Sequence, residues 1–180
     1  MESTVTATRD ELVDRCKRGE AMAFKELYLR YVKAMYNTCL RILNNASEAE
    51  DVLQESFSEA FRNIHSFEYR SGFGSWIKQI CINRSINQLK KRKVTWVDIE
   101  LATHSEIVHV VEPDEHDIQF RVDKVKQAIQ QLPDGYRAVL SLYLLEGYDH
   151  EEIAEILQVS GSTSRTQYIR AKQKLLQLLK

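Results

Sequence analysis

The apolar residues of the first half of the chain recur every three or four positions, which is the spacing of an amphipathic α-helix. They predict helices over residues 10–19, 21–43, 47–64 and 75–91. Gly19 is placed to end the first of these helices in a left-handed conformation. Ser47 and Glu50 are predicted to form a capping box at the start of the third. The longest apolar stripe, in residues 21–43, consists of Phe24, Leu27, Tyr28, Tyr31, Val32, Met35, Cys39 and Leu43.

The pattern weakens between residues 94 and 117, where acidic residues and Pro113 interrupt it. Helical periodicity returns near Ile118 and continues to the end of the chain, with Asp134 as the predicted cap of its second helix. These observations predict an all-α protein made of two small helical domains, residues 1–93 and 118–180. The stretch 94–117 is interpreted as a flexible acidic linker between them.

The last two helices have the features of a helix-turn-helix. Asp149 and Glu152 are spaced as a capping box, and Ala154 is small enough for a second helix to cross closely. Residues 160–162, Ser-Gly-Ser, supply a short turn and a cap for the last helix. An ordinary three-helix bundle with a solvated basic face is the alternative. The capping box, the small Ala154, the short turn and the last helix without acidic residues agree with one another and favour the DNA-binding module.

The last helix is predicted to place its polar side chains toward DNA. If Tyr168 is buried, a rotation of about 100° per residue puts Ala171, Leu175 and Leu179 on the same side. A recognition helix meets base edges near its N-terminus, where Arg reads guanine, Thr or Ile touches a thymine methyl and Gln reads adenine. The residues that face away or lie on the flank are Arg165, Thr166, Ile169, Arg170 and Gln173.

The formal net charge of −1 conceals a strong segregation of charges. Residues 84–93 hold five basic side chains and no acid, and residues 163–180 hold another five and no acid. Residues 98–123 hold eight acids against Arg121 alone. Two basic ends of helical units, separated by an acidic stretch, predict two contacts with one polyanion.

Composition narrows the classes of function. Hydrophobic residues make up 43% of the chain, while Gly (6) and Pro (2) are scarce, which favours a packed all-α protein over a disordered one. No apolar run approaches the roughly 20 residues that span a bilayer, and residues 1–10 lack an apolar signal-peptide core. We therefore expect a cytoplasmic protein.

The sequence gives no sign of an active site. Cys16, Cys39 and Cys81 lie far apart inside helical patterns and are predicted to be buried thiols. The histidines show no paired metal-ligand spacing, and no phosphate loop or nucleophile motif is present. We expect no metal, no cofactor and no small-molecule substrate, and we do not expect an enzyme.

Three motifs carry a family resemblance. Residues 51–57, DVLQESF, are followed by residues 73–83, FGSWIKQICIN, with the basic run 84–93 after them. Residues 132–137, 146–154 and 163–172 read LPDGYR, EGYDHEEIA and TSRTQYIRAK. The chain resembles bacterial sigma-70-type RNA polymerase sigma factors of the extracytoplasmic-function group, from about Asp10 to Lys180. It departs from many members at Asn87, where they have Asp, and at Gly161, which lies one position earlier than their glycine before Thr163.

The resemblance implies a sigma-2 domain in residues 1–93, which binds core polymerase and melts the −10 element, and a sigma-4 domain in residues 118–180, which reads the −35 element. The implied polymerase contacts are Asp51, Gln54 and Glu55. The implied −10 contacts are Phe67, Phe73, Asn83, Arg84, Lys90, Lys91, Arg92 and Lys93. The implied −35 contacts are Thr163, Arg165, Thr166, Gln167, Ile169, Arg170, Lys172 and Gln173.

Other readings of these residues stay open. The acidic side chains of residues 47–58 also suit a solvated surface, and Trp76 suits a core position. The resemblance implies core RNA polymerase, promoter DNA and an anti-sigma factor as partners, with nucleoid association in the holoenzyme. The alternative function is a helix-turn-helix regulator whose N-terminal half binds a signal or dimerises. The basic, aromatic-flanked residues 67–93 favour the sigma factor, because a simple repressor needs only one DNA-reading unit.

Overall fold

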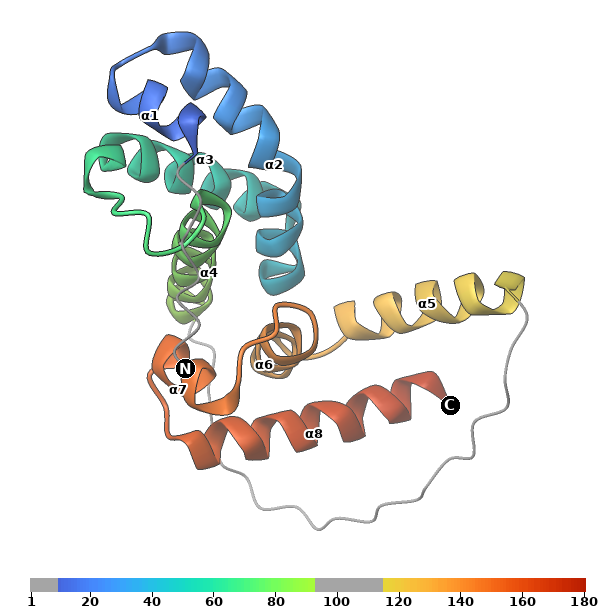
Figure 1. Cartoon of the computed structure of the whole chain (residues 1–180). Coiled ribbons are helices and arrows are strands. Elements are labelled where there is room, and N and C mark those ends of the chain that lie inside the picture. The colour runs from blue at the N-terminus through green and yellow to red at the C-terminus, as the bar shows by residue number, and fades with distance from the viewer. Residues whose placement is uncertain (1–9, 93–114) are drawn as a thin grey trace, which may run out of the picture. The chain divides into compact units, whose positions relative to one another are not determined.

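The computed structural model describes residues 10–92 and 115–180, with side chains from residue 122 onward in the second stretch. The chain divides into two compact units, Met1–Arg92 and Lys93–Lys180. All regular elements within the described ranges are helices, as the sequence predicts, and Figure 1 labels them. Lys93 and the predicted linker up to residue 114 lie outside the described residues.

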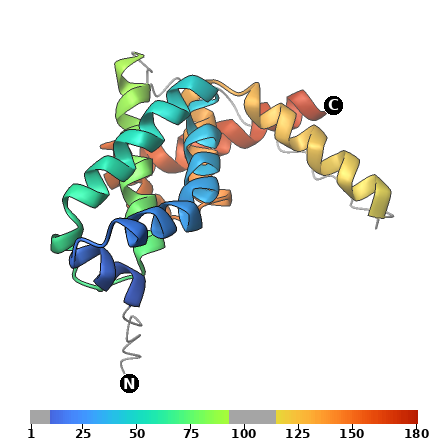
Figure 2. The same ribbon diagram turned by 90° about the horizontal axis from the view of Figure 1, so that it is seen from above.

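In its described part, residues 10–92, the first unit has four α-helices and a short 3-10 helix. They are α1 (Glu11–Lys17), α2 (Ala21–Leu43), α3 (Ala46–Arg62), the 3-10 helix η1 (Ile64–Ser66) and α4 (Phe73–Lys91). Helices α2, α3 and α4 all pack against one another, and α1 packs against α2 and η1. Figures 1 and 2 show α1 folded back beside the start of α2.

Helix α4 supplies much of the core of this unit. Ile77, Ile82 and Ile86 on α4 are almost fully buried, as is Leu27 on α2. On the α3 side, Ser56 donates its hydroxyl to the carbonyl of Val52 at 2.7 Å, so this buried polar group is satisfied within its own helix. The three cysteines are free and buried, which confirms the predicted thiols. Burial raises the pKa of the Cys16 thiol, which keeps it protonated and unreactive.

Two turns decide where the helices begin and end. Gly19 has φ 82°, which confirms the predicted left-handed end of α1. Asn44 is left-handed as well, with φ 50°, and ends α2. The cap predicted at Ser47 is wrong: Asn45 caps α3, and its Oδ1 accepts a hydrogen bond from the backbone N–H of Glu48 at 3.1 Å. The helix therefore starts two residues earlier, because Asn45 already has the extended backbone that a cap needs.

Within residues 115–180, the second unit has four helices, α5 (Glu115–Gln130), α6 (Asp134–Leu144), α7 (His150–Leu157) and α8 (Gly161–Leu179). Helix α8 packs against the other three and runs along the unit below α5 and α6 in Figure 1. Leu132, Leu140 and Ala171 form a buried cluster, and Ile129, Tyr136, Leu175 and Leu178 pack around it. Helix α5 begins at Glu115, before the predicted Ile118. The apolar pattern could not locate this start, because residues 115–117 are polar.

A buried arginine holds the turn between α5 and α6. Arg137 is only 3% exposed, and its Nη1 donates to the carbonyl oxygen of Leu132 at 2.8 Å. Its Nη2 binds the carboxylate of Asp134. Asp134 is therefore the first residue of α6 and an ion-pair partner, and the predicted role as cap is wrong, since Pro133 occupies the cap position. A buried guanidinium requires such partners, because an unpaired charge in the core is costly.

The corrected cap of α3 can be tested by stability. We expect Asn45→Ala to lower the free energy of unfolding of the first unit by about 1 kcal/mol, because the N–H of Glu48 loses its acceptor. Ser47→Ala is the matched control and should change it by less than about 0.5 kcal/mol. Urea unfolding followed by the fluorescence of Trp76, in a Trp96→Phe background, measures both. An equal loss in the two variants would contradict the assignment.

Candidate polymerase and nucleic-acid interfaces

A polar ridge runs along the outer face of α3. Asp51, Gln54 and Glu55 are all exposed there. The carboxylate of Glu55 lies 2.5 Å from Nη1 of Arg84 on α4, and that of Glu59 lies 2.6 Å from Nη2 of the same guanidinium. Beside this pair lies an open cleft of 590 Å³. It is lined by Gln54, Glu55, Ser58, Arg62 and Arg84.

A second ion pair joins the other end of α3 to α4. Arg92 binds the carboxylate of Glu48 and also donates from Nη1 to the carbonyl of Leu43 at 3.1 Å. Gln88 donates to the same Glu48 at 3.3 Å. Two cations that the sequence assigns to DNA, Arg84 and Arg92, are thus bound to acids of α3. The sequence pattern could not reveal these pairs, because the partners lie 25 and 44 positions apart.

The loop before α4 is built on an aromatic cluster. Phe67 and Phe73 are 4% and 2% exposed, so both rings belong to the core, and they pack edge-on or tilted against each other and against half-buried Trp76. Above them lies a cavity of 220 Å³. It is lined by Ser66, Phe67, Glu68, Arg70, Ser71 and Trp76. The burial of both phenylalanines favours a supporting role for them and leaves the polar loop residues at the cavity mouth.

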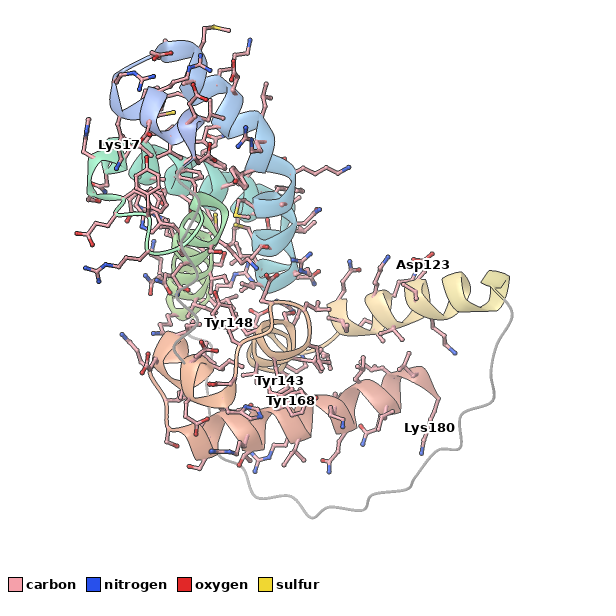
Figure 3. The ribbon with its side chains drawn as sticks, in the orientation of Figure 1. Lys17, Asp123, Tyr143, Tyr148, Tyr168 and Lys180 are labelled. Carbon is pink, nitrogen blue, oxygen red and sulfur yellow. The ribbon has the colours of Figure 1, made fainter. Side chains whose placement is uncertain are left out.

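Helix α1 fixes the conformation of this loop. Lys17 donates from Nζ to the carbonyl oxygen of Phe67 at 2.6 Å, and the same Nζ lies 4.5 Å from the centre of the Tyr69 ring. The Tyr69 hydroxyl donates to Asp14. Tyr69 has φ 58°, an unusual conformation for a residue with a side chain, and these contacts compensate for it. Figure 3 labels Lys17 beside the loop. Neither Lys17 nor Asp14 was identified from the sequence, where nothing links them to residue 69.

The outer face of α4 carries the remaining predicted −10 residues. Asn83 is exposed, and its Oδ1 accepts a hydrogen bond from Nε2 of Gln79 at 3.3 Å. Lys91 is exposed and Lys90 is half-buried near the C-terminal end of the helix. Asn83 thus lies about two turns before Lys90 and Lys91, on a helix that begins directly after the aromatic loop.

The helix-turn-helix is present in the second unit. The Asp149 carboxylate accepts hydrogen bonds from the N–H groups of Glu151 and Glu152 at 2.9 and 2.8 Å, and Glu152 accepts from the N–H of Asp149 at 2.8 Å. This confirms the predicted capping box. Gln158, with φ 60°, turns the chain after α7, and Ser160 caps α8 by accepting from the N–H of Thr163 at 3.1 Å.

Helix α8 is rotated relative to the prediction. Ser164, Gln167 and Ala171 form its most buried stripe, and Tyr168 is only half-buried. In this conformation Gln167 is 3% exposed on the face turned to the core, so its side chain is not on the surface that the sequence assigns to the −35 element. Polar Ser164 and Gln167 hid this stripe from the apolar pattern. The predicted residues with exposed or half-exposed side chains are Thr163, Arg165, Thr166, Ile169, Arg170, Lys172 and Gln173.

An aromatic stack joins α6, α7 and α8. The rings of Tyr143 and His150 lie 4.6 Å apart and nearly parallel, and Tyr143 lies 4.5 Å from Tyr168, which Figure 3 labels. Nδ1 of His150 is 3.0 Å from the buried hydroxyl of Ser164, so the two helices also share a hydrogen bond. Burial raises the pKa of Tyr168. Sequence reasoning missed His150, because a histidine at the start of a helix carries no packing signal.

Two findings concern what the described residues lack. Within residues 10–92 and 115–180, none of the helices combines the length and the apolar character that a bilayer crossing requires. In the part of the chain that the structure describes, no group of three or more His, Cys, Asp and Glu side chains is placed to hold a metal ion.

Two all-helical units, the second ending in a helix-turn-helix with a basic recognition helix, define a DNA-binding protein of transcription. Sigma-70 region 2 matches residues 27–95, and sigma-70 region 4 matches residues 123–175. The RNA polymerase sigma-H factor of Pseudomonas aeruginosa is 33% identical over 172 residues, which cover 91% of this chain and 89% of that protein. The extracytoplasmic-function (ECF) sigma factor SigW of Bacillus subtilis is 32% identical over 172 residues, 91% of this chain and 92% of that one.

Solved structures agree in fold. The sigma factor RpoE of Bartonella quintana, in complex with the anti-sigma factor NepR, is similar with a TM-score of 0.55 and 25% identity, covering 87% of this chain and 96% of that one. The chain belongs to the extracytoplasmic-function family of sigma-70-type RNA polymerase sigma factors. It is a transcription initiation factor that works with core RNA polymerase on promoter DNA, and such factors are not enzymes.

The burial of Gln167 can be tested directly. We expect Gln167→Ala to lower the free energy of unfolding of the second unit by about 1–3 kcal/mol, because it removes a buried side chain and leaves a cavity. We expect no change in base preference at −35. Gln173→Ala, at a half-exposed position of the same helix, is the control and should leave stability within about 0.5 kcal/mol. Thermal unfolding and promoter-library selection measure the two effects. If Gln167→Ala changed the base preference and left the stability unaltered, Gln167 would contact DNA and would not be a core residue.

Proposed function

We propose that residues 1–93 bind core RNA polymerase and open the −10 element, while residues 118–180 read the −35 element. Residues 94–117 would span the distance between the two. The observation that carries the proposal is the helix-turn-helix of α7 and α8, with its recognition helix free of acids. Transcription in vitro with purified core polymerase tests it, because a factor that starts promoter-specific transcription cannot be an ordinary regulator. The regulator alternative is not favoured, since both sigma regions match along the chain.

Docking on the polymerase is assigned to the α3 ridge. Asp51 and Gln54 offer an exposed carboxylate and an exposed amide on one face of the helix. A basic partner surface would bind them through charge-assisted hydrogen bonds. Glu55 already shares its charge with Arg84, so it contributes less free charge to the partner than Asp51 does.

Opening of the −10 element is assigned to the loop cavity and to α4. An unpaired base needs stacking and hydrogen bonds to replace those of the duplex. The cavity offers the edge of Trp76 and the polar groups of Arg70 and Ser71, with Phe67 and Phe73 as its support. Asn83 would contact DNA beside it. Lys90, Lys91 and Lys93 would hold phosphates, whereas Arg84 and Arg92 would first have to leave their carboxylates.

Reading of the −35 element is assigned to the solvent side of α8. Arg165 and Ile169 are exposed there, and Arg170 is half-buried. These side chains match the donors and the apolar group that read guanine and thymine in the major groove. The other contacts would come from Thr163, Thr166, Lys172 and Gln173, with Gln167 supporting the helix from inside.

An anti-sigma protein is the proposed regulatory partner. The RpoE structure is a complex with the anti-sigma factor NepR, and the similar CnrH structure, 21% identical, holds the cytosolic domain of CnrY. A factor that binds core polymerase works where the polymerase is, in the bacterial cytoplasm, and would be nucleoid-associated when it is part of the holoenzyme. Purification of the tagged chain from its own cells, followed by identification of stoichiometric partners, tests both points.

The docking surface generates one prediction. We expect Asp51→Arg to weaken binding to core polymerase by about tenfold or more, because it sets a cation against a basic surface. Glu50→Arg is the matched control, with the same charge change at an exposed position about 100° away on α3, and should bind nearly normally. Competition for core polymerase, measured by fluorescence anisotropy of the labelled chain, gives the affinities. Equal affinities of the two variants would eliminate the ridge as the docking site.

The −10 assignment generates another. We expect Asn83→Ala to slow promoter opening by roughly threefold to tenfold, the value of one hydrogen bond to a base, without changing holoenzyme assembly. Asn87→Ala, one turn along and also exposed, serves as the control. Permanganate reactivity of unpaired thymines gives the rate, and native gel analysis gives assembly. A normal rate for Asn83→Ala would mean that Asn83 only bonds Gln79 on the helix surface.

A further inference from the structure

Arg165, a proposed reader of the −35 element, does not stand alone on the recognition helix. Its Nη2 lies 2.6 Å from Oε1 of Glu151, which belongs to α7. Both side chains are more than half exposed, at 52% and 66%. The pair therefore links the two helices of the helix-turn-helix at the surface, near the N-terminal ends of both, where a recognition helix approaches base edges.

Gly161 leaves the space that this pair occupies. A Cβ added at residue 161 would lie 3.1 Å from Oε1 of Glu151 and 3.2 Å from Nη1 of Arg165, closer than ordinary carbon contacts. The backbone of Gly161 is not in the left-handed region, so its conformation alone does not demand glycine. An alanine here would make the ends of these two side chains shift by a few tenths of an ångström, which would disturb the geometry of the ion pair.

Such a pair contributes little to stability. Exposed ion pairs gain little Coulomb energy in water and lose side-chain entropy. Its consequence is instead geometric and electrostatic. The carboxylate uses one side of the planar guanidinium and leaves other N–H donors in a fixed orientation, suited to the O6 and N7 acceptors of guanine. It also offsets the positive charge, which makes the arginine less attracted to phosphates, whose pull is independent of sequence.

We infer that Glu151 is a positioning residue that sets −35 specificity by holding Arg165, and that Gly161 provides the room for it. The inference rests on the proposed function of α8. Without Glu151, the Arg165 side chain would move between phosphates and bases. The ion pair holds its guanidinium in one orientation, so that it binds one base pair. Without it, Arg165 keeps its charge and loses its direction.

The test uses holoenzyme assembled with Glu151→Gln, Gly161→Ala, Arg165→Ala and the double variant Glu151→Gln with Arg165→Ala. Glu155→Gln is the matched control, because it makes the same charge change at an exposed position one turn along α7. Selection from a library randomised at the −35 element gives the preference at each base pair. Binding to one promoter across a salt series gives the salt slope, and thermal unfolding gives stability.

We expect Arg165→Ala to abolish preference at one base pair and Glu151→Gln to reduce preference at the same base pair by several-fold. Glu151→Gln should leave the melting temperature unchanged and steepen the salt slope by up to about one, because the freed cation reaches a phosphate. Gly161→Ala should reduce the preference at the same base pair to a lesser degree. It should not lower stability, since alanine favours the helix. The double variant should equal Arg165→Ala, and Glu155→Gln should equal the wild type.

Each contrary result has a distinct meaning. If Arg165→Ala relaxes one base pair and Glu151→Gln does not, the positioning role of Glu151 is wrong while the proposed reading by α8 stands. If Glu151→Gln still acts in the Arg165→Ala background, Glu151 works on DNA or polymerase directly, and the inference falls. If Arg165→Ala leaves every preference unchanged, the assignment of Arg165 as a reader fails and the inference falls with it. A parallel loss of stability and of all preferences in Glu151→Gln would reduce the pair to a structural contact.

Discussion

The burial of α4 against α2 and α3 is the contact on which the first unit depends. Ile77, Ile82 and Ile86 project from α4 into the core and are almost fully excluded from solvent. The apolar area that they remove from water contributes to the hydrophobic stabilisation that orders the helices. It also decides which sides of α3 and α4 stay outside. The packing of α4 therefore determines where the polar ridge, the cleft beside it and the aromatic loop lie.

The packing of α4 against α3 brings opposite charges of the two helices together. Glu55 and Glu59 meet Arg84, and Glu48 meets Arg92, although a separate function is assigned to each helix. The pairs are half-exposed and add modest stability. Their larger effect is on function, since acids proposed to face the polymerase and cations proposed to face DNA partly neutralise each other in the free protein. Asp51, Gln54, Asn83 and Lys91 are among the exposed polar groups that lie outside these pairs.

The second unit meets a different demand, because a recognition helix needs an orientation rather than a large core. Short α7 is held by its capping box at Asp149 and by contacts with α8. His150 bonds Ser164 from the start of α7, and Glu151, the next residue, bonds Arg165. Successive residues of one helix thus hold successive residues of the other, one pair inside and one pair at the surface. The inner pair joins the two helices, and the outer pair holds the side chain that we propose reads DNA.

The sequence by itself determined the helices, the division into two helical halves and the family. These follow from signals between residues three or four positions apart: the apolar stripe of residues 21–43, the left-handed Gly19 and the box of Asp149 and Glu152. The tertiary structure alone decided which polar side chains remain available. Gln167 is inside because α8 is rotated toward its small and polar residues, and Arg84 meets Glu55 and Glu59 because α3 and α4 are neighbours. Such contacts depend on how two helices pack against each other, and this packing cannot be predicted from the apolar periodicity of each helix alone.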